Sequence, residues 1–238
     1  MRTLRNHSQL PRRQLPIWEL WRWALGVVIH GLLSAVMVPS AVAGDLGVVI
    51  RTYDASGLSE ADRTASLAAA AAILEDAGLA IARLACDGVE AAAASHACLT
   101  PLRPYELSLR LVRIPTVGPA EAGRHILRRV NPVTLGYSLV ETQVRFGSLA
   151  TVYVDRVAAL AGVSRVDLPT LLGRAIAHEI GHLLLGTAAH ARDGVMRAVW
   201  SPEALRRGTG GDWRFTPQDA EALREAARRR SAQPLHTW

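Results

Sequence analysis

The alternation of polar and apolar residues predicts a β-sheet. Residues 106–114 (ELSLRLVRI) alternate as a strand with one buried face does. Short apolar or β-branched runs predict four more strands, at 47–52, 79–84, 133–140 and 150–157. The chain is therefore expected to form a sheet of about five strands.

Three further segments carry the boundary signals of helices. Each begins at a side chain that can cap a helix, and a glycine ends the first two. The segments are 59–78, from Ser59 to Gly78, 169–185, between Asp167 and Gly186, and 217–230, which Thr216 precedes. This order predicts an α+β domain, α/β-like in its N-terminal part, with two long helices covering a twisted mixed sheet.

The first 43 residues have the pattern of an export signal. Arginines at the start precede an apolar run at 23–38, and Ala41 and Ala43 form a small-x-small cleavage site. We expect a cut after Ala43 and a periplasmic or extracellular domain over 44–238. Without the cut, the segment would anchor the chain in a membrane, although the run is shorter than the ~20 residues that a span usually needs.

Cleavage also changes the charge of the protein. The chain has 27 Lys and Arg against 21 Asp and Glu, a net charge of +6, and every basic residue is arginine. Because the signal holds five arginines and one glutamate, the exported part carries only +2. This charge gives no support for nucleic-acid binding. The expected partner is a peptide or protein substrate, with no stable membrane span once the signal is removed.

The chain has two cysteines, Cys86 and Cys98. An exported protein folds in an oxidising compartment, so a disulfide between them is expected, with two unpaired thiols as the alternative. Their spacing is too wide for a zinc knuckle.

Candidate chemistry lies in the motif H-E-x-x-H, formed by His178, Glu179 and His182 in the predicted helix 169–185. Four residues advance about 400° and about 6 Å along a helix, so both imidazoles leave the same face. Both can then bind one zinc ion at about 2.0–2.1 Å. Glu179 would lie beside the metal and could take a proton from a water whose pKa zinc lowers towards ~7. Without a metal, burial of these polar groups among isoleucines and leucines would be costly.

A catalytic zinc needs a third protein ligand and an open position for water. His190 is the favoured candidate, because Gly186 breaks the helix and allows a left-handed turn that brings the chain back towards the metal. Asp193 and Glu203 are the other two candidates.

The series His178-Glu179-x-x-His182, Gly186, His190 and Gly194-Val195-Met196 resembles the metzincin zinc metallopeptidases. In that family a third histidine follows a glycine turn, and a methionine in a tight turn lies beneath the metal, a position that Met196 matches. The resemblance covers most of residues 45–238. It implies an N-terminal subdomain over 44–186 and a C-terminal subdomain over 187–238 with the Met-turn and a final helix.

The spacing departs from the family pattern H-E-x-x-H-x-x-G-x-x-H. Three residues precede Gly186 and three more precede His190, one more in each interval than in the family. No tyrosine follows Met196 closely, and Trp200 is expected to pack in the core. The departure concerns the helix end and the third ligand, and it leaves the H-E-x-x-H motif unchanged.

The resemblance implies a secreted zinc endopeptidase with Glu179 as general base. Strand 133–140 would then be the sheet edge above the cleft, where Gly136 and Tyr137 face an extended peptide that pairs with the strand. One alternative is a peptidase of the class that binds zinc through two histidines and a glutamate, here Glu203. Another is a non-catalytic, zinc-stabilised peptide-binding module. Glu179 argues against the module, because a structural zinc site needs no base and is usually closed by four protein ligands.

Overall fold

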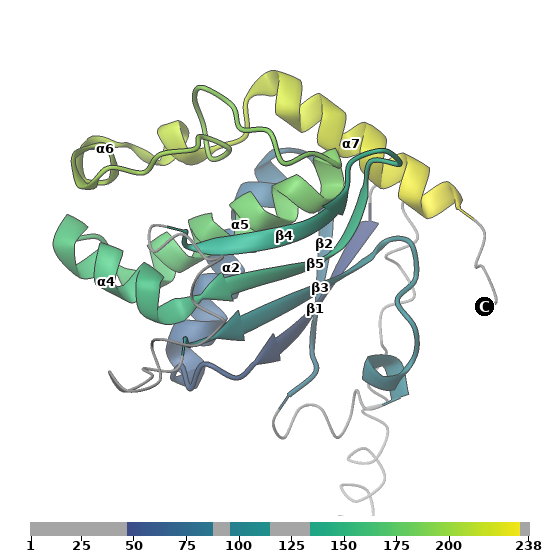
Figure 1. The fold of residues 1–238 in the computed structure, drawn as a ribbon, viewed down its shortest axis with the longest axis horizontal. Helices are drawn as coiled ribbons and strands as arrows, with labels where there is room; N and C mark the ends of the chain where they lie inside the picture. The colour runs from purple at the N-terminus through teal and green to yellow at the C-terminus, as the bar shows by residue number, and fades with distance from the viewer. Residues whose placement is uncertain (1–46, 88–95, 115–133, 234–238) are drawn as a thin grey trace, which may run out of the picture. The chain divides into compact units, whose positions relative to one another are not determined.

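A computed structural model of the chain describes residues 47–87, 96–114 and 134–233 (Figure 1). These residues belong to one compact unit. The predicted signal over 1–43 and its cut after Ala43 lie outside the described residues.

The core of this unit is a mixed sheet of five strands in the order β2-β1-β3-β5-β4. Four strands are parallel, and β4 pairs antiparallel with β5 at one edge. The strands are β1 (Gly47–Asp54), β2 (Ala80–Ala85), β3 (Glu106–Val112), β4 (Gly136–Glu141) and β5 (Phe146–Tyr153). The predicted five-stranded mixed sheet and α+β class are therefore confirmed. Val133, the predicted first residue of the edge strand, lies outside the described residues.

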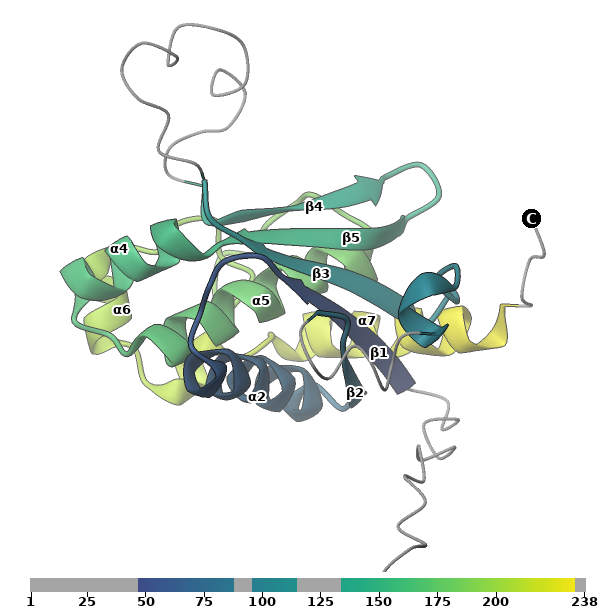
Figure 2. The ribbon, with the colours of Figure 1, turned by 90° about the horizontal axis from the view of Figure 1, so that it is seen from below.

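Two long helices, α2 (Glu60–Asp76) and α5 (Leu168–Leu185), pack together on one side of the sheet (Figure 2). The predicted caps are confirmed. The Ser59 side chain accepts a hydrogen bond from the amide of Asp62, and the Asp167 side chain accepts one from the amide of Thr170. Local capping thus fixes where both helices begin.

The sequence prediction was wrong after Tyr153. Residues 154–157 were assigned to a strand, but helix α4 (Val154–Ser164) begins directly where β5 ends. Val154, Val157 and Ala161 are buried at helical spacing, and the alanines between them favour a helix. Val154 and Val157 favour a strand when considered alone, and the helical spacing is visible only once Ala161 is included.

The segment after α5 contains further helical structure. It contains a short helix, α6 (Pro202–Arg207), and a 3₁₀ turn, η4 (Gly210–Trp213), before α7 (Pro217–Ala232). Arg230 joins α7 to the rest of the unit. Its guanidinium donates to the carbonyls of Pro104, Gly147 and Leu183 at 3.0, 2.6 and 2.9 Å.

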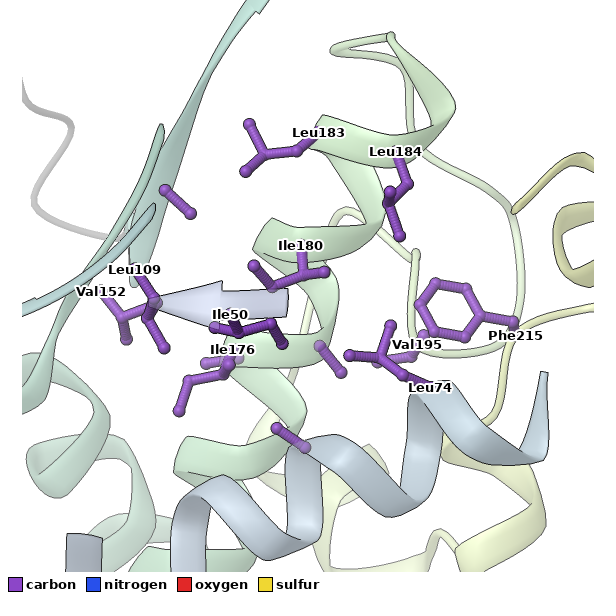
Figure 3. Packing of buried hydrophobic residues seen from close by; sticks show 14 of the residues in the cluster. Ile50, Leu74, Leu109, Val152, Ile176, Ile180, Leu183, Leu184, Val195 and Phe215 are labelled. Carbon is purple, nitrogen blue, oxygen red and sulfur yellow. The ribbon is translucent and has the colours of Figure 1, made fainter. Parts of the chain in front are cut away.

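Helix α5 lies at the centre of the hydrophobic core. Fourteen of its 18 residues are buried, so the helix is enclosed by the rest of the unit on almost every side. Figure 3 shows its side chains packed between the sheet, α2 and the segment that follows the helix. The labelled residues are Ile50, Leu74, Leu109, Val152, Ile176, Ile180, Leu183, Leu184, Val195 and Phe215. A motif on this helix is held in a rigid environment.

The predicted disulfide between Cys86 and Cys98 is confirmed, with the two Cα atoms 5.5 Å apart. It ties the end of β2 to the segment before β3. Two residues of β1 also hold that segment, because Arg51 donates to the carbonyl of Thr100 at 2.8 Å and Tyr53 to that of Cys98 at 3.4 Å. Among the described residues, no helix has the length and apolar character needed to cross a membrane.

Candidate metal centre

Three histidines meet at the C-terminal half of α5. His178 and His182 lie one turn apart on the same helix face, and their Nε2 atoms are 3.1 Å apart. The imidazole of His190 stacks 5.2 Å from that of His178 and lies edge-on 4.8 Å from that of His182. One ligand nitrogen from each residue lies within 4.8 Å of the others. The three side chains are therefore close enough to bind one metal ion.

Gly186 makes the turn that brings His190 to the other two histidines. It has φ 63°, in the left-handed region, and its amide donates to the carbonyl of His182 at 3.0 Å. A Cβ at this position would lie 2.4 Å from the carbonyl oxygen of Arg145, in the turn between β4 and β5. Both the conformation and the close contact require glycine. Although the intervals on either side of Gly186 are each one residue longer than in the metzincin pattern, the turn still brings His190 to the other two histidines.

Backbone carbonyls orient two of the imidazoles. The Nδ1 atoms of His178 and His182 lie 2.8 Å from the carbonyl oxygens of Val195 and Thr187 respectively. Since a carbonyl oxygen only accepts, each Nδ1 carries the proton and each Nε2 presents a lone pair. Two lone pairs that face each other at 3.1 Å repel, and a cation between them removes the repulsion. The donor arrangement therefore fits a metal ion.

Burial keeps these two histidines in the form that binds metals. It lowers the pKa of His178 to about 4, and it also lowers the pKa of His182. Hydrogen bonds to the carbonyls of Val195 and Thr187 act in the opposite direction but are the smaller effect. Both imidazoles are thus neutral near pH 7, the state required of a ligand.

Glu179 points from α5 towards the edge strand β4, and only 6% of the residue is exposed. The hydroxyl of Ser138 lies 2.6 Å from its Oε2 atom. Burial raises the pKa of Glu179 to about 7, although the hydrogen bond from Ser138 lowers it. A carboxylate with a pKa near the working pH is suited to take up a proton and release it again.

Met196 packs against the helix turn between His178 and His182. Its side chain is 1% exposed, and its sulfur would be 2.6 Å from a Cβ placed on Gly181, in the helix turn between His178 and His182. Gly194, with φ 75°, forms the turn before it, and the carbonyl of Met196 accepts from the amide of Ala191 at 2.9 Å. The turn thus places Met196 against the helix that carries the motif.

This contact predicts a loss of stability on replacing Gly181 with alanine. Alanine favours a helix by up to about 1 kcal/mol over glycine, but its methyl group would overlap the Met196 sulfur and the Phe215 ring. We expect the free energy of unfolding to fall by about 1–3 kcal/mol, as for other overpacked cores. Urea unfolding with chelator present would measure it. Gly162→Ala in α4, where no atom lies within 4 Å of the added Cβ, is the control and should not destabilise the protein. Equal stability of both variants would mean that Met196 is loosely packed.

A cleft of about 640 Å³ opens beside the three histidines. Gly136 and Tyr137, the residues expected to face a cleft, line it from β4, which is the edge strand as expected. The lining also includes Ala159 and Leu160 of α4. The helix that the sequence prediction missed therefore forms one wall of the cleft.

Trp200 lines the cleft and also packs against the buried Trp213. Its ring lies 5.6 Å from that of His178 and 5.1 Å from that of Trp213. The interpretation of Trp200 as a core residue is therefore incomplete, since the residue also lines the cleft beside the histidine cluster.

The other two ligand candidates lie outside the histidine cluster. Asp193 is exposed. Glu203 is exposed on α6 and forms an ion pair with Arg206 at 2.9 Å. Of the three candidates, His190 is the one that the fold brings to His178 and His182.

Sequence reasoning missed Ser138, which contacts the carboxylate of Glu179. Its signal was its position two residues after Gly136, because alternate residues of a strand share a face.

No family model matches this chain, and no curated protein is significantly similar to it in sequence. The function therefore has to be argued from the site.

Proposed function

We propose that this chain is a zinc-dependent endopeptidase. The observation that carries the proposal is the convergence of His178, His182 and His190 in a cleft, with the carboxylate of Glu179 on the same helix and an edge strand beside it. Three histidines with an open fourth position form a donor set found in catalytic zinc sites. The resemblance of the motif series to the metzincins supports the same assignment.

Each part of the site has a role in this reaction. Zinc held by the three histidines would polarise the substrate carbonyl and lower the pKa of the attacking water. Glu179 accepts the proton of that water and passes it to the nitrogen of the leaving amine as the C–N bond breaks. As the edge strand of the described sheet, β4 can hold an extended peptide through backbone hydrogen bonds, next to Gly136 and Tyr137.

Export is part of the proposal. The pattern of residues 1–43 is that of a cleaved signal, and the Cys86–Cys98 disulfide is typical of proteins that fold in an oxidising compartment. The domain would then act on peptides or proteins in the periplasm or outside the cell.

Metal analysis combined with a cleavage assay tests the proposal. The purified protein should contain one zinc ion per chain and hydrolyse an unfolded protein, and a chelator should stop hydrolysis until zinc is restored. Zinc should also raise the thermal unfolding temperature, because a ligand at 100 times its dissociation constant contributes about 2.7 kcal/mol.

Two results would contradict the proposal in different ways. Protein that binds no zinc would show that the three histidines do not form a zinc site. Protein that binds zinc and peptides but cleaves neither short nor unfolded substrates would instead be a peptide-binding module. In that case the zinc coordination position that the three histidines leave open would bind a peptide without hydrolysing it.

A further inference from the structure

Strand β4 presents alternate residues to α5. Gly136, Ser138 and Val140 are buried or partly buried, whereas Tyr137 and Leu139 are exposed. Period-two alternation puts the first three side-chain positions on the face that meets the helix. Two of these three positions contact the side chain of Glu179.

The hydroxyl of Ser138 reaches two oxygens of Glu179. It lies 2.6 Å from Oε2 of the carboxylate and 2.7 Å from the backbone carbonyl oxygen of the same residue. A serine hydroxyl has one proton to donate and lone pairs to accept with. It can donate to the ionised carboxylate, or accept from the protonated carboxyl while it donates to the carbonyl. The contact can therefore persist through a transfer of the proton.

Gly136 limits the space around the other oxygen of the Glu179 carboxylate. A Cβ at this position would lie 2.8 Å from Oε1 of Glu179 and 3.0 Å from its Cγ. The backbone of β4 thus approaches one carboxylate oxygen while Ser138 bonds the other. Because the residue is 6% exposed, little room is left for the carboxylate to adopt another position.

From these contacts we propose that Ser138 is a positioning residue for peptide hydrolysis, which holds the carboxylate of Glu179 in place between β4 and the metal site. The inference rests on the proposed peptidase function. In the reaction, the proton leaves the attacking water, resides on Glu179 and moves to the amine nitrogen. Ser138 undergoes no net gain or loss of a proton, so its effect is on geometry.

Three substitutions of Ser138 distinguish the effect of losing the hydroxyl from the effect of changing the shape of the side chain. Thr and Val have nearly the same shape and both suit a strand, but only Thr keeps the hydroxyl. We expect Ser138→Ala and Ser138→Val to lower kcat about 10- to 100-fold, the effect of losing one hydrogen bond to a charged group. KM and zinc content should change by less than about twofold, because neither the ligands nor the strand edge is altered. Ser138→Thr should recover most of kcat.

The measurements are kcat and KM on a fluorogenic peptide, with zinc content and thermal unfolding for each variant of the full chain. Ser108→Ala on β3, a partly buried serine two strands away, is the matched control and should behave as wild type. A Ser138→Ala variant with wild-type kcat would overturn the inference, as would equal kcat for the Thr and Val variants. Failure of the peptidase proposal looks different, since zinc-loaded wild type would then hydrolyse nothing, and the role of Ser138 would be overturned with it.

Discussion

Replacing Glu179 with glutamine should leave the metal site intact and reduce peptide hydrolysis by about 100- to 10,000-fold, the range attributed to general acid–base catalysis. Glutamine has almost the same size as glutamate, and its amide can still bond the hydroxyl of Ser138. It cannot take a proton from water. Zinc content should stay at one per chain, because the proposed ligands are the three histidines and Glu179 is not one of them.

The experiment needs kcat, KM and bound zinc for wild type and Glu179→Gln. Glu225→Gln, an exposed substitution on α7, controls for the general effect of removing a negative charge. Retained hydrolysis in the glutamine variant would show that another group acts as base. A loss of zinc together with activity would show that Glu179 supports metal binding, and the division of roles proposed for the site would then be wrong.

Replacing His190 with alanine should weaken zinc binding by more than about 100-fold. Loss of a hydrogen-bond partner behind a ligand costs 10- to 100-fold in affinity in other metal sites, so loss of a ligand itself should cost at least the upper value. Competition with a chromophoric chelator would measure the zinc dissociation constant. Hydrolysis at limiting zinc should fall in parallel.

Glu203→Gln and Asp193→Asn are the matched controls for His190→Ala, because these two residues were the competing ligand candidates. Both lie outside the histidine cluster, so their variants should bind zinc as wild type does. If Glu203→Gln lost zinc and His190→Ala kept it, the site would belong to the class with two histidines and a glutamate, and α6 would have to move towards the cleft.

Elements with strong local signals were predictable from the sequence. The alternation at 106–114 identified β3, although the strand ends two residues earlier, at Val112. Capping side chains identified the starts of α2, α5 and α7. These signals depend on contacts within a few residues, and a single sequence records such contacts directly.

The walls of the site were less predictable, because they depend on contacts between distant segments. The position of β4 at the sheet edge required the resemblance, since hydrophobic pattern alone does not give strand order. Helix α4 was missed because its first residues, Val154 and Val157, favour strands in isolation. The contact of Ser138 with Glu179 joins residues 41 positions apart.

His190, the third histidine of the cluster, is an intermediate case. The spacing around Gly186 departs from the family pattern, yet a glycine between the helix and His190 was enough to predict the turn. The sequence could not show that the backbone of Arg145, in the turn that connects β4 and β5, approaches Gly186 so closely that no side chain fits there.

The hydrogen bonds behind His178 and His182 have a consequence for how the protein tolerates mutation. Many metal sites orient their histidines through a carboxylate side chain, which one substitution can remove. Here both Nδ1 atoms bond to main-chain carbonyls, which every residue type possesses. Substitutions at Thr187 or Val195 therefore leave the acceptors in place as long as the chain keeps its path. The orientation of the two imidazoles therefore depends on the path of the chain, which the two glycine turns set, and the side chains of Thr187 and Val195 supply no part of these two hydrogen bonds.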